Sequence, residues 1–148
     1  MARNGSRGFR LAKLLELRER QVELCRDRVE RCRAELERWE VHRRDVAARR
    51  SADGLAPGGG VSQGAADLQL REQGRRWYQR ELIRIGKAAE QRRQDLEAAR
   101  AELWQAEQRR ERIDRLRQRF EAEQKRQDKR ARRRRLNRWA QTPSNGSP

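Results

Sequence analysis

The sequence predicts an all-α protein in which two long helices form an antiparallel coiled-coil hairpin, with a longer second helix. In two long segments the apolar residues recur at steps that alternate between four and three, which is the a/d pattern of coiled coils. A stretch rich in glycine and proline separates the two segments and is expected to stop a helix. Charged residues make up 42% of the chain and apolar residues 34%, a share of apolar residues below that of ordinary globular domains.

The first helix is predicted over residues 9–50, after a flexible N-terminus at residues 1–8. Residues 9–50 contain neither glycine nor proline, so nothing in them interrupts a helix. The expected packing positions, called the seam below, are Leu11, Leu15, Arg18, Val22, Cys25, Val29, Cys32, Leu36, Trp39, Arg43 and Val46. Residues 51–64 contain Pro57 and three consecutive glycines and are predicted to form a loop.

The second helix is predicted over residues 65–138, and residues 139–148 are predicted to be a disordered tail. The seam of this helix is expected at Leu82, Ile85, Ala89, Arg92, Leu96, Ala99, Leu103, Ala106, Arg110 and Ile113, with Leu68 and Tyr78 upstream. Gly74 and Gly86 lie inside the helix, and each weakens it by about 1 kcal/mol relative to alanine.

Two alignments of the helices remain open, because Leu36 faces either Tyr78 or Ile85. In both alignments the N-terminal end of the first helix lies opposite residues 105–112. Beyond these residues the second helix continues without an internal partner. The residues Ile113, Leu116 and Phe120 form an apolar i, i+3, i+7 stripe on this overhang. Such a stripe predicts a partner-binding surface, unless the first helix starts earlier or the stripe pairs in a homodimer.

Arginines interrupt the seam at four positions, namely Arg18, Arg43, Arg92 and Arg110. A buried arginine is tolerated when its stem packs and its guanidinium reaches water or a carboxylate. We interpret these positions as a weak, partly hydrated seam, in which polar residues can fix the alignment at a cost in stability.

The net charge of +16 is concentrated near the C-terminus. Residues 125–138 contain nine basic residues and one acidic residue, Asp128, so they carry half of the net charge. Such a segment attracts phosphates, acidic lipid or an acidic protein surface. Binding to an acidic protein surface requires no further sequence feature and is the preferred interpretation. The alternative is nucleic-acid binding, which would be non-specific because the segment lacks a recognised module and stacking aromatics.

The sequence contains no catalytic constellation, and we expect a protein that is not an enzyme. The single histidine, His42, has no nucleophile spaced with it, and the two cysteines, Cys25 and Cys32, lie about 10 Å apart along one helix. No metal, cofactor or small-molecule substrate is expected. No long apolar segment or signal peptide is recognised, so a cytoplasmic location is expected.

The layout of two unequal helices around a short polar break resembles the FliJ proteins of flagellar export and the YscO-type proteins of virulence secretion. The closing run Arg135-Leu136-Asn137-Arg138-Trp139-Ala140-Gln141 is similar to the aromatic-Ala-Gln ending of the flagellar branch. The resemblance implies a stalk of a bacterial type III protein export apparatus, located at the cytoplasmic face of the membrane. Whether the flagellar or the virulence branch is served stays open.

The resemblance also implies partners. The end that carries both termini would bind and activate the hexameric export ATPase, and the loop end would contact the export gate, a membrane protein; export chaperones are further candidates. By position the ATPase contacts are Phe9, Leu11, Leu15, Ile113, Leu116, Phe120, Arg132, Arg133, Arg134, Arg135 and Trp139. The corresponding gate contacts are Trp39, Val46, Tyr78 and Leu82.

Overall fold

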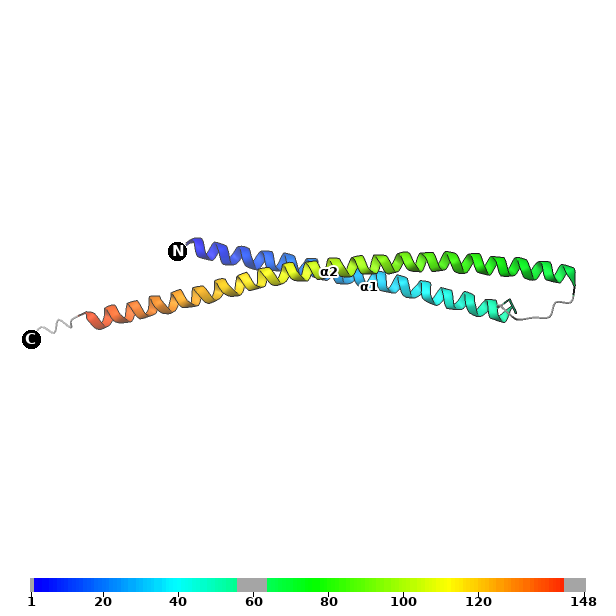
Figure 1. The fold of residues 1–148 in the computed structure, drawn as a ribbon. Helices are drawn as coiled ribbons and strands as arrows, with labels where there is room; N and C mark the ends of the chain where they lie inside the picture. The colour runs from blue at the N-terminus through cyan, green and yellow to red at the C-terminus, as the bar shows by residue number, and fades with distance from the viewer. Residues whose placement is uncertain (1, 56–63, 143–148) are drawn as a thin grey trace, which may run out of the picture. The chain divides into compact units, whose positions relative to one another are not determined.

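A computed structural model describes residues 2–55 and 64–142 and contains two helices, α1 (Ala2–Ala52) and α2 (Ala65–Gln141), with no strand among the described residues (Figure 1). The two helices pack against each other in antiparallel orientation, as the heptad pattern predicts. The prediction of an all-α hairpin with a longer second helix is therefore confirmed. The glycine run of the predicted loop, with Pro57, lies outside the described residues.

Both helices are longer than predicted. The first begins at Ala2, so the prediction of a flexible segment over residues 1–8 is wrong for residues 2–8. Within this segment Gly8 is half-buried and lies against the ring of Phe120. The second helix reaches Gln141, three residues past the predicted end, and the remainder of the predicted tail, residues 143–148, lies outside the described residues.

The chain divides into two compact units. Unit 1 consists of residues 1–22 and 105–148, and unit 2 consists of residues 23–104. Each unit therefore contains one stretch of α1 and one stretch of α2, and each is described by itself.

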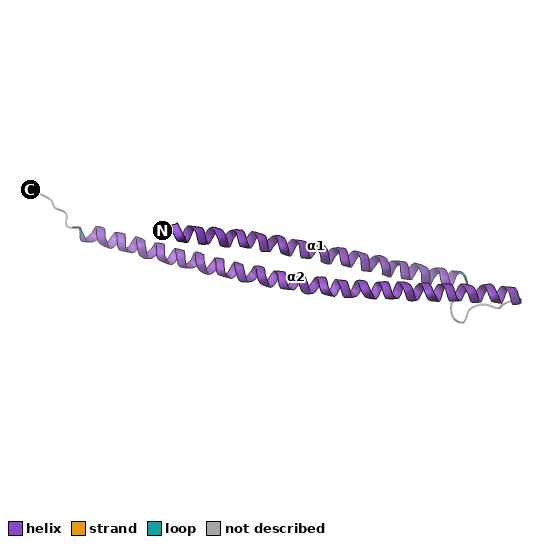
Figure 2. Cartoon of the chain, turned by 90° about the horizontal axis from the view of Figure 1, so that it is seen from above, coloured by secondary structure: helices purple, strands orange, loops and turns teal. Residues whose placement is uncertain are grey.

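In unit 2 the stretches of α1 and α2 lie side by side (Figure 2). Ion pairs and one apolar cluster join them. Arg92 Nη1 lies 3.0 Å from Glu35 Oε2, and Arg93 Nη2 lies 3.5 Å from Glu40 Oε1. The core cluster consists of the buried residues Val46, Leu55, Tyr78 and Ile85, against which Trp39 and Leu82 pack. Exposed ion pairs contribute less than about 1 kcal/mol each, so the apolar seam is the main source of stability in this unit.

The C-terminus of α1 ends in a Schellman motif that delivers an apolar residue to this core. Gly54 has a φ of +67°, its N–H donates to the carbonyl of Ser51 at 3.1 Å, and the N–H of Leu55 donates to the carbonyl of Arg50 at 3.1 Å. Only glycine adopts this backbone conformation without steric cost. The motif turns Leu55 onto α2, where Leu55 is buried against Gly74.

The alignment in unit 2 differs from both predicted alternatives. The Glu35–Arg92 ion pair and the Leu55–Gly74 contact place Leu36 opposite Arg92, one heptad beyond the nearer alternative, Ile85. The same alignment places the large Trp39 opposite the small Ala89, which is buried. Gly74 has room for Leu55 in this alignment because it lacks a Cβ, so steric fit decides the alignment.

Unit 1 also pairs its helices further along α2 than predicted. A Cβ on Gly8 would lie 3.0 Å from Cε1 of Phe120, and this contact places Leu11 opposite Arg117 rather than Leu103 or Arg110. The prediction that α1 ends opposite residues 105–112 is therefore wrong, and the alternative that α1 starts earlier is correct. In α2 the half-buried positions continue as Ile113, Arg117, Phe120 and Gln124.

Candidate partner-binding surfaces

Most of the net charge belongs to unit 1. This unit contains 21 basic and 8 acidic residues, for a net charge of +13, whereas unit 2 contains 18 and 15, for +3. Both chain termini belong to unit 1 as well. A charge of this size on one helix pair creates a positive potential that attracts an acidic partner and falls off within about 10 Å at 0.1 M salt.

The C-terminal part of α2 extends beyond the last seam position. After Gln124 every described residue is exposed, and we call residues 125–142 the basic extension. Its helical part, residues 125–141, is about 25 Å long at 1.5 Å per residue. Residues 132–135 are four consecutive arginines, which point in different directions around the helix at 100° per residue. The basic extension therefore presents positive charge around much of its circumference.

Two large apolar side chains lie on the basic extension and face solvent. Trp139 is 84% exposed and Leu136 is 69% exposed, three residues away on the same side of the helix. An exposed tryptophan among arginines is typical of an interface residue, because the ring buries a large area at little cost in side-chain entropy.

The structure gathers all of the predicted ATPase contacts in unit 1 but gives them different surroundings. Phe9 is 62% exposed, and its ring centroid lies 4.8 Å from Lys13 Nζ. Leu15 is buried, and the three residues Leu11, Ile113 and Phe120 are half-buried in the helix interface. The expected apolar stripe is thus wrong as an unpaired surface, and only Leu116, at 47% exposure, lies outside the seam. The arginines at 132–135 and Trp139 are exposed, as a contact surface requires.

The predicted gate contacts lie together in unit 2, but inside its core. Val46 and Tyr78 are buried, and Trp39 and Leu82 pack against the same cluster. The prediction that Val46 and Tyr78 contact a partner is therefore wrong for the closed hairpin, because their surfaces are already covered. The hydroxyl of Tyr78 donates a hydrogen bond to Asp53 Oδ2, and this bond raises the pKa of Tyr78 above its ordinary value of 10.0.

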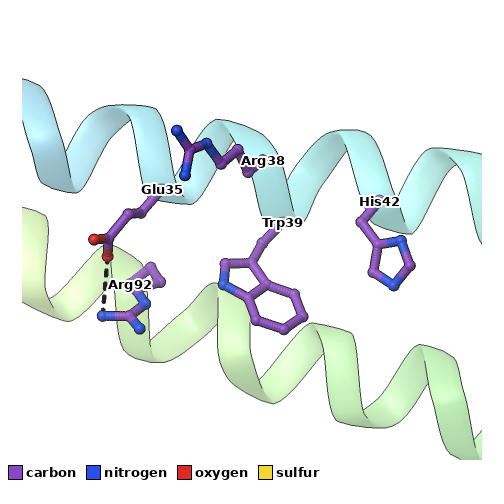
Figure 3. A pocket seen from close by; sticks show the side chains of 5 residues that line it. All are labelled: Glu35, Arg38, Trp39, His42 and Arg92. Atoms are coloured by element: carbon purple, nitrogen blue, oxygen red, sulfur yellow. Dashed lines mark ion pairs between the residues drawn. The ribbon is translucent and has the colours of Figure 1, made fainter.

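One groove in unit 2 lies beside this core (Figure 3). Its lining residues are Glu35, Arg38, Trp39 and His42 of α1 and Arg92 of α2. The carboxylate of Glu35 reaches across to Arg92, and the guanidinium of Arg84 lies 6.0 Å from the ring centroid of Trp39. Glu35 and Arg92 already pair with each other, and Trp39 packs against the core. We therefore interpret the groove as the side of the helix interface and not as a ligand site.

His42 is not isolated in this groove. Its Nε2 atom lies 3.9 Å from Oε1 of Glu81, which also accepts hydrogen bonds from Arg84. The hydrogen bonds from Arg84, together with the charges of Arg84 and His42, hold the pKa of Glu81 below its ordinary value of 4.5. His42 and Glu81 connect the two helices, and Arg84 pairs with Glu81 within α2. None of the three lies against a cysteine or serine nucleophile in the described residues.

The seam arginines differ from one another in their partners. In unit 2, Arg92 pairs with Glu35 and with Asp95, at 3.0 and 3.4 Å. In unit 1, the Nε atoms of Arg18 and Arg110 are buried without a hydrogen-bond partner among the described residues. The Nε atom of Arg117, at the seam position after Ile113, also lacks a hydrogen-bond partner, but Arg117 forms ion pairs with Asp114 at 3.5 Å and with Glu121 at 3.7 Å.

Arg117 was not among the expected seam residues, although the sequence carries a signal for it. Arg117 follows Ile113 by four residues and precedes Phe120 by three, so the alternating steps continue through it. An apolar stripe through Leu116 instead departs from that alternation. Reading the spacing strictly, without preferring apolar residues, would have found Arg117.

Within residues 2–55 and 64–142, no group of three or more histidine, cysteine, aspartate or glutamate side chains could hold a metal ion. The two cysteines are half-buried free thiols in unit 2. No helix in the described part of the chain is long and apolar enough to cross a membrane.

The fold and its surfaces define the protein as a helical hairpin that carries a basic helical extension. Comparison of the chain with protein-family models, with curated proteins and with solved structures found no match. Its function is therefore inferred from the geometry of units 1 and 2.

Proposed function

We propose that the protein is a non-enzymatic coiled-coil stalk component of a bacterial type III protein export apparatus, which binds and activates the hexameric export ATPase through unit 1. In this proposal the protein acts at the cytoplasmic face of the membrane and links the ATPase to the export gate. The resemblance to FliJ and YscO-type proteins motivates the proposal, and the branch, flagellar or virulence, stays open.

The single observation that carries the proposal is the basic extension, which continues α2 after Gln124 and is exposed throughout. A helix that is exposed on all sides can enter a ring of subunits and meet several of them at once. The charge of +13 in unit 1 favours an acidic binding surface, and Trp139 with Leu136 supplies apolar anchors. Val46 and Tyr78 are left out of the proposed gate contacts because they are buried, which leaves the half-buried residues Trp39 and Leu82.

The test uses the purified full chain and its cognate export ATPase. The ATPase alone and with the protein is followed by sedimentation for hexamer formation and by phosphate release for turnover. Binding with increased turnover is expected, and absence of detectable binding would overturn the proposal.

A matched pair of tryptophan variants locates the contact. Trp139→Ala is expected to weaken ATPase binding roughly tenfold to thirtyfold, the cost of removing an interface hot spot of about 2 kcal/mol. Trp104→Ala is the control, because Trp104 is 64% exposed but belongs to unit 2. Equal effects of the two variants would exclude the basic extension as the contact.

Non-specific nucleic-acid binding is the second candidate, favoured by the arginines that surround the basic extension. Phosphate contacts release counterions, so the affinity would fall linearly with salt concentration on logarithmic axes. Submicromolar binding to duplex DNA at physiological salt, lost on deletion of residues 125–148, would favour this candidate over the export stalk.

A further inference from the structure

The alignment of α1 and α2 in unit 1 places two seam arginines at the same level of the helix pair. The contact between Gly8 and Phe120 sets the alignment. Arg18 follows Gly8 by ten residues and Arg110 precedes Phe120 by ten, so the two arginines face each other in an antiparallel pair. Both are half-buried seam residues, and the Nε atom of each is buried. Two positive side chains therefore share one layer of the helix interface.

No carboxylate among the described residues pairs with either arginine. Nη1 of Arg18 donates to the amide oxygen of Gln21 at 2.9 Å, which neutralises no charge, and no ion pair is found for Arg110. By contrast, the seam residues Arg92 in unit 2 and Arg117 in unit 1 each have two carboxylate partners. Like charges in a partly desolvated layer repel each other, so an anion bound at this layer would stabilise the pair.

Apolar side chains lie on the same flank as this layer. Leu14 and Leu116 each directly precede a seam position, Leu15 and Arg117, and such flanking positions face each other across an antiparallel pair. Gln21, which binds Arg18, occupies the same flanking position one heptad after Leu14. The flank also includes Leu17, which is 51% exposed, so unneutralised guanidinium groups adjoin an apolar patch.

We propose that this flank of unit 1 binds an acidic amphipathic helix of a partner protein, whose carboxylates reach Arg18 and Arg110 while its apolar face covers Leu14, Leu17 and Leu116. This site is distinct from the basic extension, and the proposal does not require the export function.

The recessed position of the arginines favours a helix over a nucleic acid. Helices pack 8–10 Å apart, and a third helix lies in the furrow between two others with its side chains directed into the seam. A duplex presents its phosphates on a wide, rigid cylinder, which meets outward-pointing arginines before recessed ones. Nucleic acid also offers no apolar face for the leucines.

The first experiment measures binding of a labelled synthetic peptide to the full chain by fluorescence anisotropy. The probe is a peptide of about 15 residues, near the length at which isolated helices become marginally stable, with leucines on one face and glutamates beside them. A second peptide replaces every glutamate with glutamine. The glutamate peptide is expected to bind at least tenfold more tightly, and equal affinity would overturn the proposal.

The second experiment compares two double variants that each remove two arginines, and so remove the same charge. The double variant Arg18→Met with Arg110→Met is expected to lower the peptide affinity at least tenfold. The control, Arg20→Met with Arg115→Met, removes the same charge from exposed positions outside the seam and the flank of unit 1 and is expected to lower the peptide affinity less than threefold. Equal losses would mean that only bulk charge matters, and the proposal would fail.

Folding is monitored in the same samples. Replacing buried arginines by apolar residues of similar size is often stabilising, so the seam variant is expected to keep its helicity and to unfold at a higher temperature. If this variant does not fold, Leu17→Gln with Leu116→Gln leaves the charge unchanged and is expected to lower peptide affinity by itself. Unchanged affinity in that variant would overturn the proposal.

Two further outcomes identify a different occupant. If the affinity for duplex DNA falls with the seam arginines as much as the affinity for the peptide, the site binds phosphate and the proposal fails. If the mass of the chain in solution shows a dimer that the peptide does not dissociate, the flank is covered by a second copy and the proposal also fails.

Discussion

Leu55 packs against Gly74 so closely that a Cβ added to Gly74 would lie 2.8 Å from Cδ1 of Leu55. The contact joins the capped end of α1 to α2, and Leu55 is buried in the same cluster as Val46, Tyr78 and Ile85. A glycine that weakens an isolated helix thus provides the space in which the end of α1 packs.

Gly74→Ala and Gly86→Ala form a matched pair that tests this contact. A Cβ at Gly86 would meet nothing within 4 Å, so Gly86→Ala is expected to stabilise the protein by about 1 kcal/mol through helix propensity. Gly74→Ala is expected to lose that gain, since Leu55 is held in the core and must shift. Urea unfolding measures both, and equal stabilisation would mean that the contact imposes no constraint.

Phe120→Ala and Leu116→Ala distinguish the seam of unit 1 from its flank. Phe120 lies against Gly8 inside the interface, whereas Leu116 is half-exposed. We expect Phe120→Ala to destabilise by about 1–2 kcal/mol, below the 3–5 kcal/mol of a fully buried phenylalanine, and Leu116→Ala by less than about 0.5 kcal/mol. Hydrogen exchange of the amides in residues 5–22 should accelerate in the first variant only. Acceleration in the second would place Leu116 in the interface.

Tyr78 makes the stability of the folded protein depend on pH in the alkaline range. Its pKa is raised above 10.0 in the folded state by the hydrogen bond to Asp53, and burial adds to the shift. The stabilisation is therefore fully present below the ordinary pKa and is lost as pH rises through the folded-state pKa.

The chain has one tyrosine, so the ultraviolet absorbance of tyrosinate reports this group alone. The titration midpoint should lie above 10.0 in the native protein and return toward it in urea. Tyr78→Phe should remove the corresponding part of the alkaline loss of stability. A native midpoint at or below the midpoint in urea would contradict the hydrogen bond to Asp53.

Glu81 makes the stability of the folded protein depend on pH in the acid range, where stability is lost as pH falls. Arg84 donates hydrogen bonds to Glu81, and the pKa of Glu81 is lowered below 4.5. Its contribution is present above the ordinary pKa and is lost as pH falls through the folded-state pKa.

Glu81→Gln should therefore reduce stability at neutral pH and flatten its decline in acid. Glu97→Gln removes the same charge from an exposed position of the same helix and serves as the control. Thermal unfolding from neutral to acid pH measures both variants, and parallel curves for the wild type and Glu81→Gln would rule out this contribution.

Much of the fold follows from local sequence pattern. The alternating steps predicted nearly every seam position of α1, including Leu15, Val22 and Val46, which are buried as expected. Arg43 is the exception, since it is exposed. The pattern is reliable because a seven-residue apolar period has one packing solution on each helix, whatever its partner.

The alignment between the helices could not be read from that pattern, because a shift of one heptad leaves each seam position facing another seam position. Contacts of particular shape decide it, such as Leu55 on Gly74 and Gly8 on Phe120. The alignment also determines which predicted contact residues are covered. It places Ile113 and Phe120 in the helix interface and Tyr78 in the core.

The heptad period and the charge are local properties of the chain, so two long helices with a basic end could be predicted from the residues alone. The position of Arg18 opposite Arg110 and the start of the exposed part of α2 after Gln124 are known only from the packing of the two helices. Those features depend on which heptads meet, and steric complementarity across the interface selects among alignments that the period leaves equivalent.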